Sequence, residues 1–200
     1  MKVKICGITN LADALVAIEY GADALGFIFA KASPRFITKE QIKQIVSALP
    51  PFITTVGVFT EGTKEEVETS VSECGISLIQ LHGRFSLEII AAFSQKAIEV
   101  VSLQNLDSHI AGRVARARAI LLDIGQNKID PFDRGTLFDL PSFPNRNVIL
   151  AGGLTPENVR EAILNVKPYG VDVCSGVEME KGKKDHEKMR RFILNAKGHA

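Results

Sequence analysis

Short apolar or β-branched runs alternate with amphipathic stretches along the whole chain. The runs have the length and composition of buried strands, and the stretches between them place apolar residues at helical spacing. Strands are expected at 3–9, 22–29, 53–59, 77–83, 97–103, 118–124, 147–153 and 170–176, and helices at 10–21, 38–49, 63–75, 86–95, 106–117, 136–143, 155–166 and 184–196. This alternation predicts βα units around a parallel sheet.

Three of the expected helices begin with a recognisable start signal. A threonine followed three residues later by Gln or Glu is typical of a capping box, and a proline directly after a threonine favours the first helical position. These signals are Thr38 with Gln41, Thr63 with Glu66, and Thr155 with Pro156.

Eight βα units in 200 residues lie near the compact limit of the (β/α)8 barrel, or TIM barrel. No linker or low-complexity tract interrupts the pattern, so we predict an α/β protein with a single barrel domain over residues 1–200. An open doubly wound sheet is the structural alternative. That fold usually has a GxGxxG turn after its first strand, and the turn is absent here.

Polar residues near the carboxyl ends of the strands are candidates for chemistry, because that end of a barrel holds the active site. Lys4 and Cys6 share one face of the first strand, so Cys6 should point inward near the mouth. Asp172 lies lower on the eighth strand, which closes against the first. A buried Lys4–Asp172 pair beneath Cys6 would influence the fraction of Cys6 that is present as thiolate. The alternative is that Cys6 is only a small buried hydrophobe.

Three more polar residues are expected at the mouth. Asp123 ends the run AILLD, and Gln80 and His82 lie together on the fourth strand. Asp123 is either a site residue or the cap of a loop, and His82 is either a hydrogen-bonded wall residue or a ligand contact.

Glycines follow the seventh strand, in AGGLTPENV, and the eighth, in CSGVE. Backbone N–H groups in these two loops form the common phosphate site of the barrel, and glycine permits close approach to an anion. We therefore predict phosphate contacts at Gly152, Gly153, Ser175 and Gly176, the alternative being plain turn glycines.

Twenty-four basic and twenty-three acidic residues leave a net charge of +1. This balance argues against binding of nucleic acid or an anionic membrane through bulk electrostatics, so a small-molecule partner is expected. No apolar run reaches the roughly 18 residues that span a bilayer, and the first strand begins without the regions of a leader. We expect a cytoplasmic protein, and nothing indicates an obligate protein partner.

The three cysteines, Cys6, Cys74 and Cys174, lack CxxC spacing and are expected to be reduced thiols. Cys74 and Cys174 are interpreted as structural. The basic run at 181–191 is interpreted as the solvated face of the last helix.

The segments KICGIT, LGFIFAKASPRFI, VGVF, IQLHG, ILLD, ILAGGLTPENV and GVDVCSGVE together resemble phosphoribosylanthranilate isomerase of tryptophan biosynthesis, in order and over nearly the whole chain. The resemblance implies an Amadori rearrangement of N-(5-phosphoribosyl)anthranilate to 1-(2-carboxyphenylamino)-1-deoxyribulose 5-phosphate, without metal or organic cofactor. It makes Asp123 the acid that opens the ribose ring and Cys6 the base that removes the C2 proton. Gln80, His82 and Asp172 are expected to contact the substrate.

Arg35, in the segment SPR, fits as the planar fork that holds the anthranilate carboxylate or stacks on its ring. The alternative is a surface arginine in a turn after Pro34.

One stretch departs from the family pattern. Where members usually have GGTG followed by FDW after the sixth strand, this chain has Arg134 and Leu137 in place of the outer glycines. A less permissive loop could alter closure, turnover or substrate range.

Two rival functions remain open from the residues. A metal-dependent pentulose-phosphate epimerase shares the barrel but needs histidine and carboxylate ligands on several strand ends. Of the four histidines, only His82 is expected at such a position. A phosphosugar-binding barrel with weakened or altered isomerase activity is the other.

Overall fold

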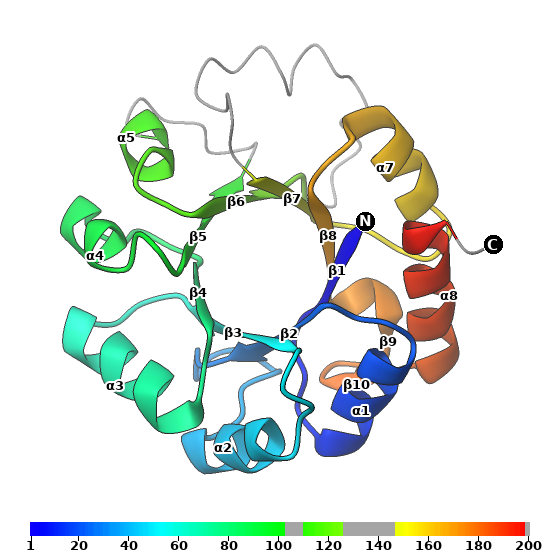
Figure 1. Cartoon of the computed structure of the whole chain (residues 1–200), viewed down its shortest axis with the longest axis horizontal. Helices are drawn as coiled ribbons and strands as arrows, with labels where there is room; N and C mark the ends of the chain where they lie inside the picture. The colour runs from blue at the N-terminus through cyan, green and yellow to red at the C-terminus, as the bar shows by residue number, and fades with distance from the viewer. Residues whose placement is uncertain (103–109, 126–146, 199–200) are drawn as a thin grey trace.

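A computed structural model describes residues 1–102, 110–125 and 147–198. Within these residues, eight parallel strands pair in chain order and close into a barrel, with β8 hydrogen-bonded to β1 (Figure 1). The strands are β1 Lys2–Ile5, β2 Ala24–Ile28, β3 Thr54–Phe59, β4 Leu78–Leu81, β5 Ala97–Ser102, β6 Ala119–Asp123, β7 Asn147–Ala151 and β8 Gly170–Val173. The predicted barrel is confirmed, and all eight predicted strands are present, although each is shorter than the range predicted for it.

Helices surround the barrel on its outer side (Figure 1). They are α1 Leu11–Glu19, α2 Lys39–Ser47, α3 Lys64–Cys74, α4 Leu87–Ala92, α5 Ile110–Val114, α7 Val159–Val166 and α8 His186–Lys197. The helix expected at 136–143 and the divergent stretch with Arg134 and Leu137 lie outside the described residues.

The start signals have mixed outcomes. Both predicted capping boxes are confirmed, at the first turns of α2 and α3. The third signal was wrong, because α7 begins at Val159 rather than at Pro156. The Asn158 side chain accepts a hydrogen bond from the Thr155 N–H and donates one to the Gly153 carbonyl, which holds residues 155–158 in a turn before the helix.

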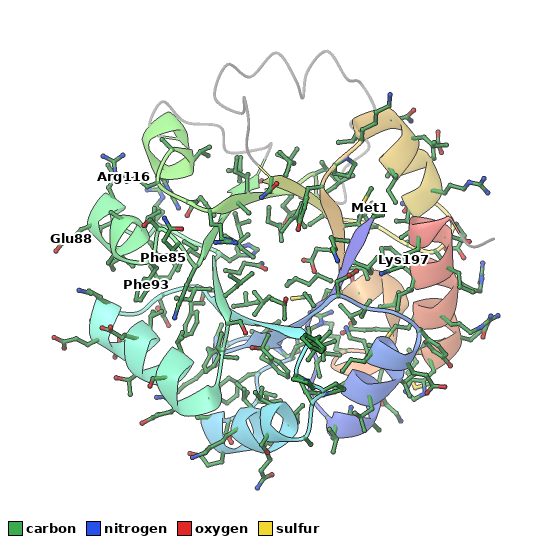
Figure 2. All side chains as sticks on the ribbon, viewed as in Figure 1. Met1, Phe85, Glu88, Phe93, Arg116 and Lys197 are labelled. Carbon is green, nitrogen blue, oxygen red and sulfur yellow. The ribbon has the colours of Figure 1, made fainter. Side chains whose placement is uncertain are left out.

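Apolar side chains form two layers, as the two faces of a strand require. The inner layer fills the barrel and includes Val56, Ile98 and Leu121. The outer layer lies between the sheet and the helices, where Val3 and Ile5 are buried. Figure 2 shows side chains filling both spaces, with Phe85 and Phe93 between α4 and the barrel and Glu88 pointing outward. Lys4 and Cys6, which alternate with Val3 and Ile5, are therefore on the inner face.

The connection from β8 to α8 departs from expectation. It contains a 3-10 turn, η2 Ser175–Val177, and a small hairpin of β9 Glu178–Glu180 and β10 Lys183–Lys184. The interpretation of 181–191 as one solvated helical face was wrong, because α8 begins at His186 and the Lys184 side chain is fully buried. The Lys184 ammonium can be buried because it is paired with Glu178.

None of the helices in the described part of the chain has the length and apolar character needed to cross a membrane.

Candidate active site

A cavity of about 210 Å³ opens at the carboxyl end of the barrel. Nine of the ten residues predicted for the site line it: Cys6, Gln80, His82, Asp123, Gly152, Gly153, Asp172, Ser175 and Gly176. The barrel thus brings together residues from β1, β4, β6, β7 and β8 and from the loops that follow them. Arg35 is not among the lining residues.

A wider groove of about 870 Å³ lies around the first turns of α2 and α3. Its Thr63 and Glu66 side chains are engaged in the capping box of α3, and its wall includes the stacked rings of Phe29 and Phe59. Because these groups serve the local structure, we take the smaller cavity, with its convergent polar groups, as the candidate site.

Cys6 follows β1 directly and is only 5% exposed. Its pKa is lowered to about 6, first by a hydrogen bond from the Cys174 thiol and further by the Lys4 ammonium, against the opposing effect of burial. A Cβ atom at Gly26 would lie 2.8 Å from the Cys6 sulfur, so glycine is required beside it. The cavity therefore holds a thiol that is largely ionised at neutral pH.

Lys4 and Asp172 form the buried pair predicted beneath Cys6. The Lys4 Nζ atom lies 2.9 Å from the Asp172 Oδ1 atom, and the two residues are direct partners across the seam between β1 and β8. Burial alone lowers the pKa of Lys4, but the charges of Asp172 and Cys6 outweigh it and raise the pKa overall. Lys4 therefore stays cationic below the thiol.

Asp123 ends β6 and faces the cavity. The Gly125 N–H donates to its Oδ1 atom at 2.9 Å, which orients the carboxyl group. A Cβ atom at Gly152 would lie 2.3 Å from the same Oδ1 atom, and Gly152 has a φ of 90°. Gly152 therefore makes room for Asp123, a requirement that the sequence pattern did not reveal.

The two predicted phosphate loops are in contact. A Cβ atom at Gly176 would lie 1.9 Å from the Leu154 carbonyl oxygen, so the loop after β8 packs directly on the loop after β7. Gly153 has a φ of 63°, a conformation that favours glycine. Together the loops form one continuous edge of the cavity.

Gln80 and His82 form the wall on the β4 side. Gln80 is 3% exposed, and within the described part of the chain its Oε1 atom has no hydrogen-bond partner. A buried acceptor left unpaired costs about 1–3 kcal/mol, so this atom is suited to receive a hydrogen bond from a ligand. His82 is exposed, and its backbone N–H donates to the Phe59 carbonyl.

Arg35 lies beside the cavity and is held by a residue that sequence reasoning missed. Its guanidinium group donates to both carboxylate oxygens of Glu178, at 2.7 and 2.6 Å, and Lys184 donates to the same carboxylate at 3.1 Å. The Arg35 side chain passes over Gly7, where a Cβ atom would lie 2.8 Å from its Cδ atom. One signal for Glu178 was available, since an acid directly follows the second glycine loop.

A family model described as N-(5'-phosphoribosyl)anthranilate (PRA) isomerase matches residues 3–195. The chain belongs to this family. As a phosphoribosylanthranilate isomerase it is an aldose–ketose isomerase of tryptophan biosynthesis, as its sequence resemblance implied.

Relatives of the isomerase cover essentially the whole chain. The N-(5'-phosphoribosyl)anthranilate isomerase of Geobacter sulfurreducens is 45% identical over 99% of both chains, and that of Pseudomonas fluorescens is 42% identical over 96% of this chain and 97% of its own. The crystal structure of the Thermotoga maritima isomerase superposes with a TM-score of 0.88 at 40% identity, covering 99% of both chains. Among the readings left open above, the isomerase is therefore the correct one.

Proposed function

We propose that Cys6 is the general base and Asp123 the general acid of this isomerase, acting on one ribose bound in the barrel mouth. The observation that supports this most directly is the thiol of lowered pKa, about 6, in the same cavity as a carboxyl group at the end of β6. The reaction needs one proton donor and one proton acceptor, and the cavity supplies one of each.

The acid step opens the ribose ring. Asp123 delivers a proton to the ring oxygen, the bond from that oxygen to C1 breaks, and the aniline nitrogen lone pair forms a protonated Schiff base at C1. The hydrogen bond from the Gly125 N–H holds the carboxyl group in one orientation for this transfer.

The base step moves the double bond. Once the Schiff base carries positive charge, the C2 proton is acidic enough for a thiolate to remove it, which gives an enolamine that becomes the ketone. Cys6 is kept in the ionised form by the Cys174 thiol and by the Lys4 ammonium. Asp172 serves this step by holding Lys4 in place, in addition to its position in the cavity wall.

The remaining residues bind the substrate. Gly152, Gly153, Ser175 and Gly176 form the edge that receives the phosphate through backbone N–H groups, and Gln80 and His82 face the sugar. Arg35, held by Glu178, receives the anthranilate carboxylate as a fork. A related isomerase crystallised with reduced 1-(o-carboxyphenylamino)-1-deoxyribulose 5-phosphate supports this ligand class; it is 41% identical over 99% of both chains, with a TM-score of 0.86.

Cys6→Ala and Asp123→Asn should each lower kcat by at least about a hundredfold, because general acid–base groups contribute roughly 10²–10⁴ to the rate. Both variants should still bind the reduced product analogue, because a proton-transfer group contributes mainly to the transition state. Turnover is followed by anthranilate fluorescence and binding by titration calorimetry.

Cys74→Ala is the matched control, because this cysteine packs at the end of α3 with its thiol directed at the Lys39 carbonyl. It should leave kcat unchanged. Near-normal turnover in either site variant would remove that residue from its proposed role.

A further inference from the structure

Two cysteines from opposite ends of the chain meet at the barrel seam. Cys6 directly follows β1 and Cys174 directly follows β8, and Ile5 and Val173, the residues just before them, are partners in the strand register. The Cys6 N–H donates to the Val173 carbonyl at 2.8 Å, which extends the pairing to the cysteines. Neighbouring strands lie about 4.8 Å apart, within the roughly 4.4–6.8 Å between Cα atoms that a disulfide spans.

Both side chains turn to the same space. Cys6 and Cys174 both line the cavity, and Cys174 contributes to the lowered pKa of the Cys6 thiol. The flanking glycines leave room for the two sulfurs: a Cβ atom at Gly26 would lie 2.8 Å from the Cys6 sulfur, and one at Gly7 would lie 2.9 Å from the Cys174 sulfur. The two cysteines therefore occupy neighbouring positions across the seam and face one cavity, where a bond between them would leave the strand pairing unchanged.

The two thiols differ in reactivity. Cys6 has its pKa lowered to about 6, whereas the hydrogen bond to Cys6 and burial raise the pKa of Cys174. One reactive thiolate next to one protonated thiol is the arrangement of redox-sensitive cysteine pairs, in which the second thiol resolves the oxidised first. The Cys174 thiol donates to Glu178 Oε1 at 3.9 Å, and the Lys184 Nζ atom, also 3.9 Å from the Cys174 sulfur, supplies a positive charge beside it.

We propose that Cys6 and Cys174 form a reversible disulfide with a hydroperoxide as oxidant, and that this bond switches the isomerase off. The Cys6 thiolate attacks one peroxide oxygen, the O–O bond breaks, and the leaving oxygen takes a proton to leave as water (from hydrogen peroxide) or as an alcohol, with Cys6 as sulfenic acid. The Cys174 sulfur then attacks the Cys6 sulfur, its proton and the hydroxyl group leave as water, and the S–S bond forms. Two thiols are oxidised and one peroxide is reduced.

The loss of activity rests on the proposed role of Cys6 as base, whereas the disulfide itself rests only on the geometry of the pair. The two claims are therefore measured separately, one by mass and one by turnover.

The purified isomerase is treated with hydrogen peroxide, blocked with an alkylating reagent, and examined by intact mass and peptide mapping beside a turnover assay. We expect a species that takes up two fewer alkyl groups than the untreated protein, a peptide linking Cys6 to Cys174, and loss of activity in proportion to that species. Dithiothreitol should restore both mass and activity.

Cys174→Ser is the decisive variant, because its hydroxyl can replace the hydrogen bond to Cys6 but cannot form a disulfide. Each protein is compared with its own untreated rate. In the Ser variant, peroxide should add oxygen to Cys6 and abolish activity. After prolonged treatment, dithiothreitol should not restore that activity. Cys74→Ala should behave like the parent protein.

Absence of the linked peptide in the parent protein, or equal dithiothreitol recovery in the parent and in Cys174→Ser, would overturn the disulfide. A linked protein that keeps full activity would overturn the switch and the role of Cys6 as base together, while leaving the disulfide in place.

Discussion

At the scale of single residues, the chemistry depends on how Cys6 is kept ionised. Because its pKa is lowered to about 6, kcat/KM should rise with pH through about 6 as the thiol ionises. Cys174→Ala removes the hydrogen bond that contributes most to this shift, so the pKa of Cys6 should rise and the acidic limb should move to higher pH. Cys174→Ser keeps a donor and should keep the limb near its original position. Profiles of kcat/KM against pH test this, and an unmoved limb in Cys174→Ala would contradict it.

At the scale of elements, the loops after β7 and β8 act as one edge, and Gly153 tests whether that edge binds phosphate. Gly153→Ala adds a side chain at a φ of 63° and should weaken binding of the reduced product analogue about tenfold, or ~1.4 kcal/mol. Gly62→Ala is the matched control, because Gly62 also has a positive φ, 134°, but lies in the loop after β3. Both changes should lower the free energy of unfolding by about 1–2 kcal/mol through backbone strain, and only the first should change affinity. Equal affinities in the two variants would place the phosphate elsewhere.

At the scale of the whole molecule, the Lys4–Asp172 pair lies where the barrel closes, between the first and last strands. Asp172→Leu should lower the free energy of unfolding by about 3–5 kcal/mol, because it leaves the buried Lys4 ammonium without its partner. The double variant Lys4→Met with Asp172→Leu should recover most of that loss, because two apolar side chains replace the pair without an uncompensated charge. Urea unfolding measures both. A double variant less stable than Asp172→Leu alone would show that the pair itself, rather than charge balance, stabilises the seam.

Much of the site could be predicted because strand faces follow from a period of two residues. Once the strands were placed, Cys6, Gln80, Asp123 and Asp172 had to lie on the inner face, and barrel closure predicted the Lys4–Asp172 pair. The positions of the glycine loops followed from the same strand order. These predictions combine the alternation of side chains along a strand with the rule that the last strand of a barrel pairs with the first. Both can be applied to the sequence alone.

Only the tertiary structure decided which loop residues meet. Cys174 was assigned a structural position, yet it lines the cavity together with Cys6. Lys184 was assigned to a solvated helix, yet it is buried against Glu178. The space that Gly152 leaves for Asp123 also appears only when β6 and β7 are side by side. The physical reason is that loop residues follow no regular alternation from which the direction of a side chain could be predicted. Contacts between segments far apart in the chain exist only after the barrel has closed.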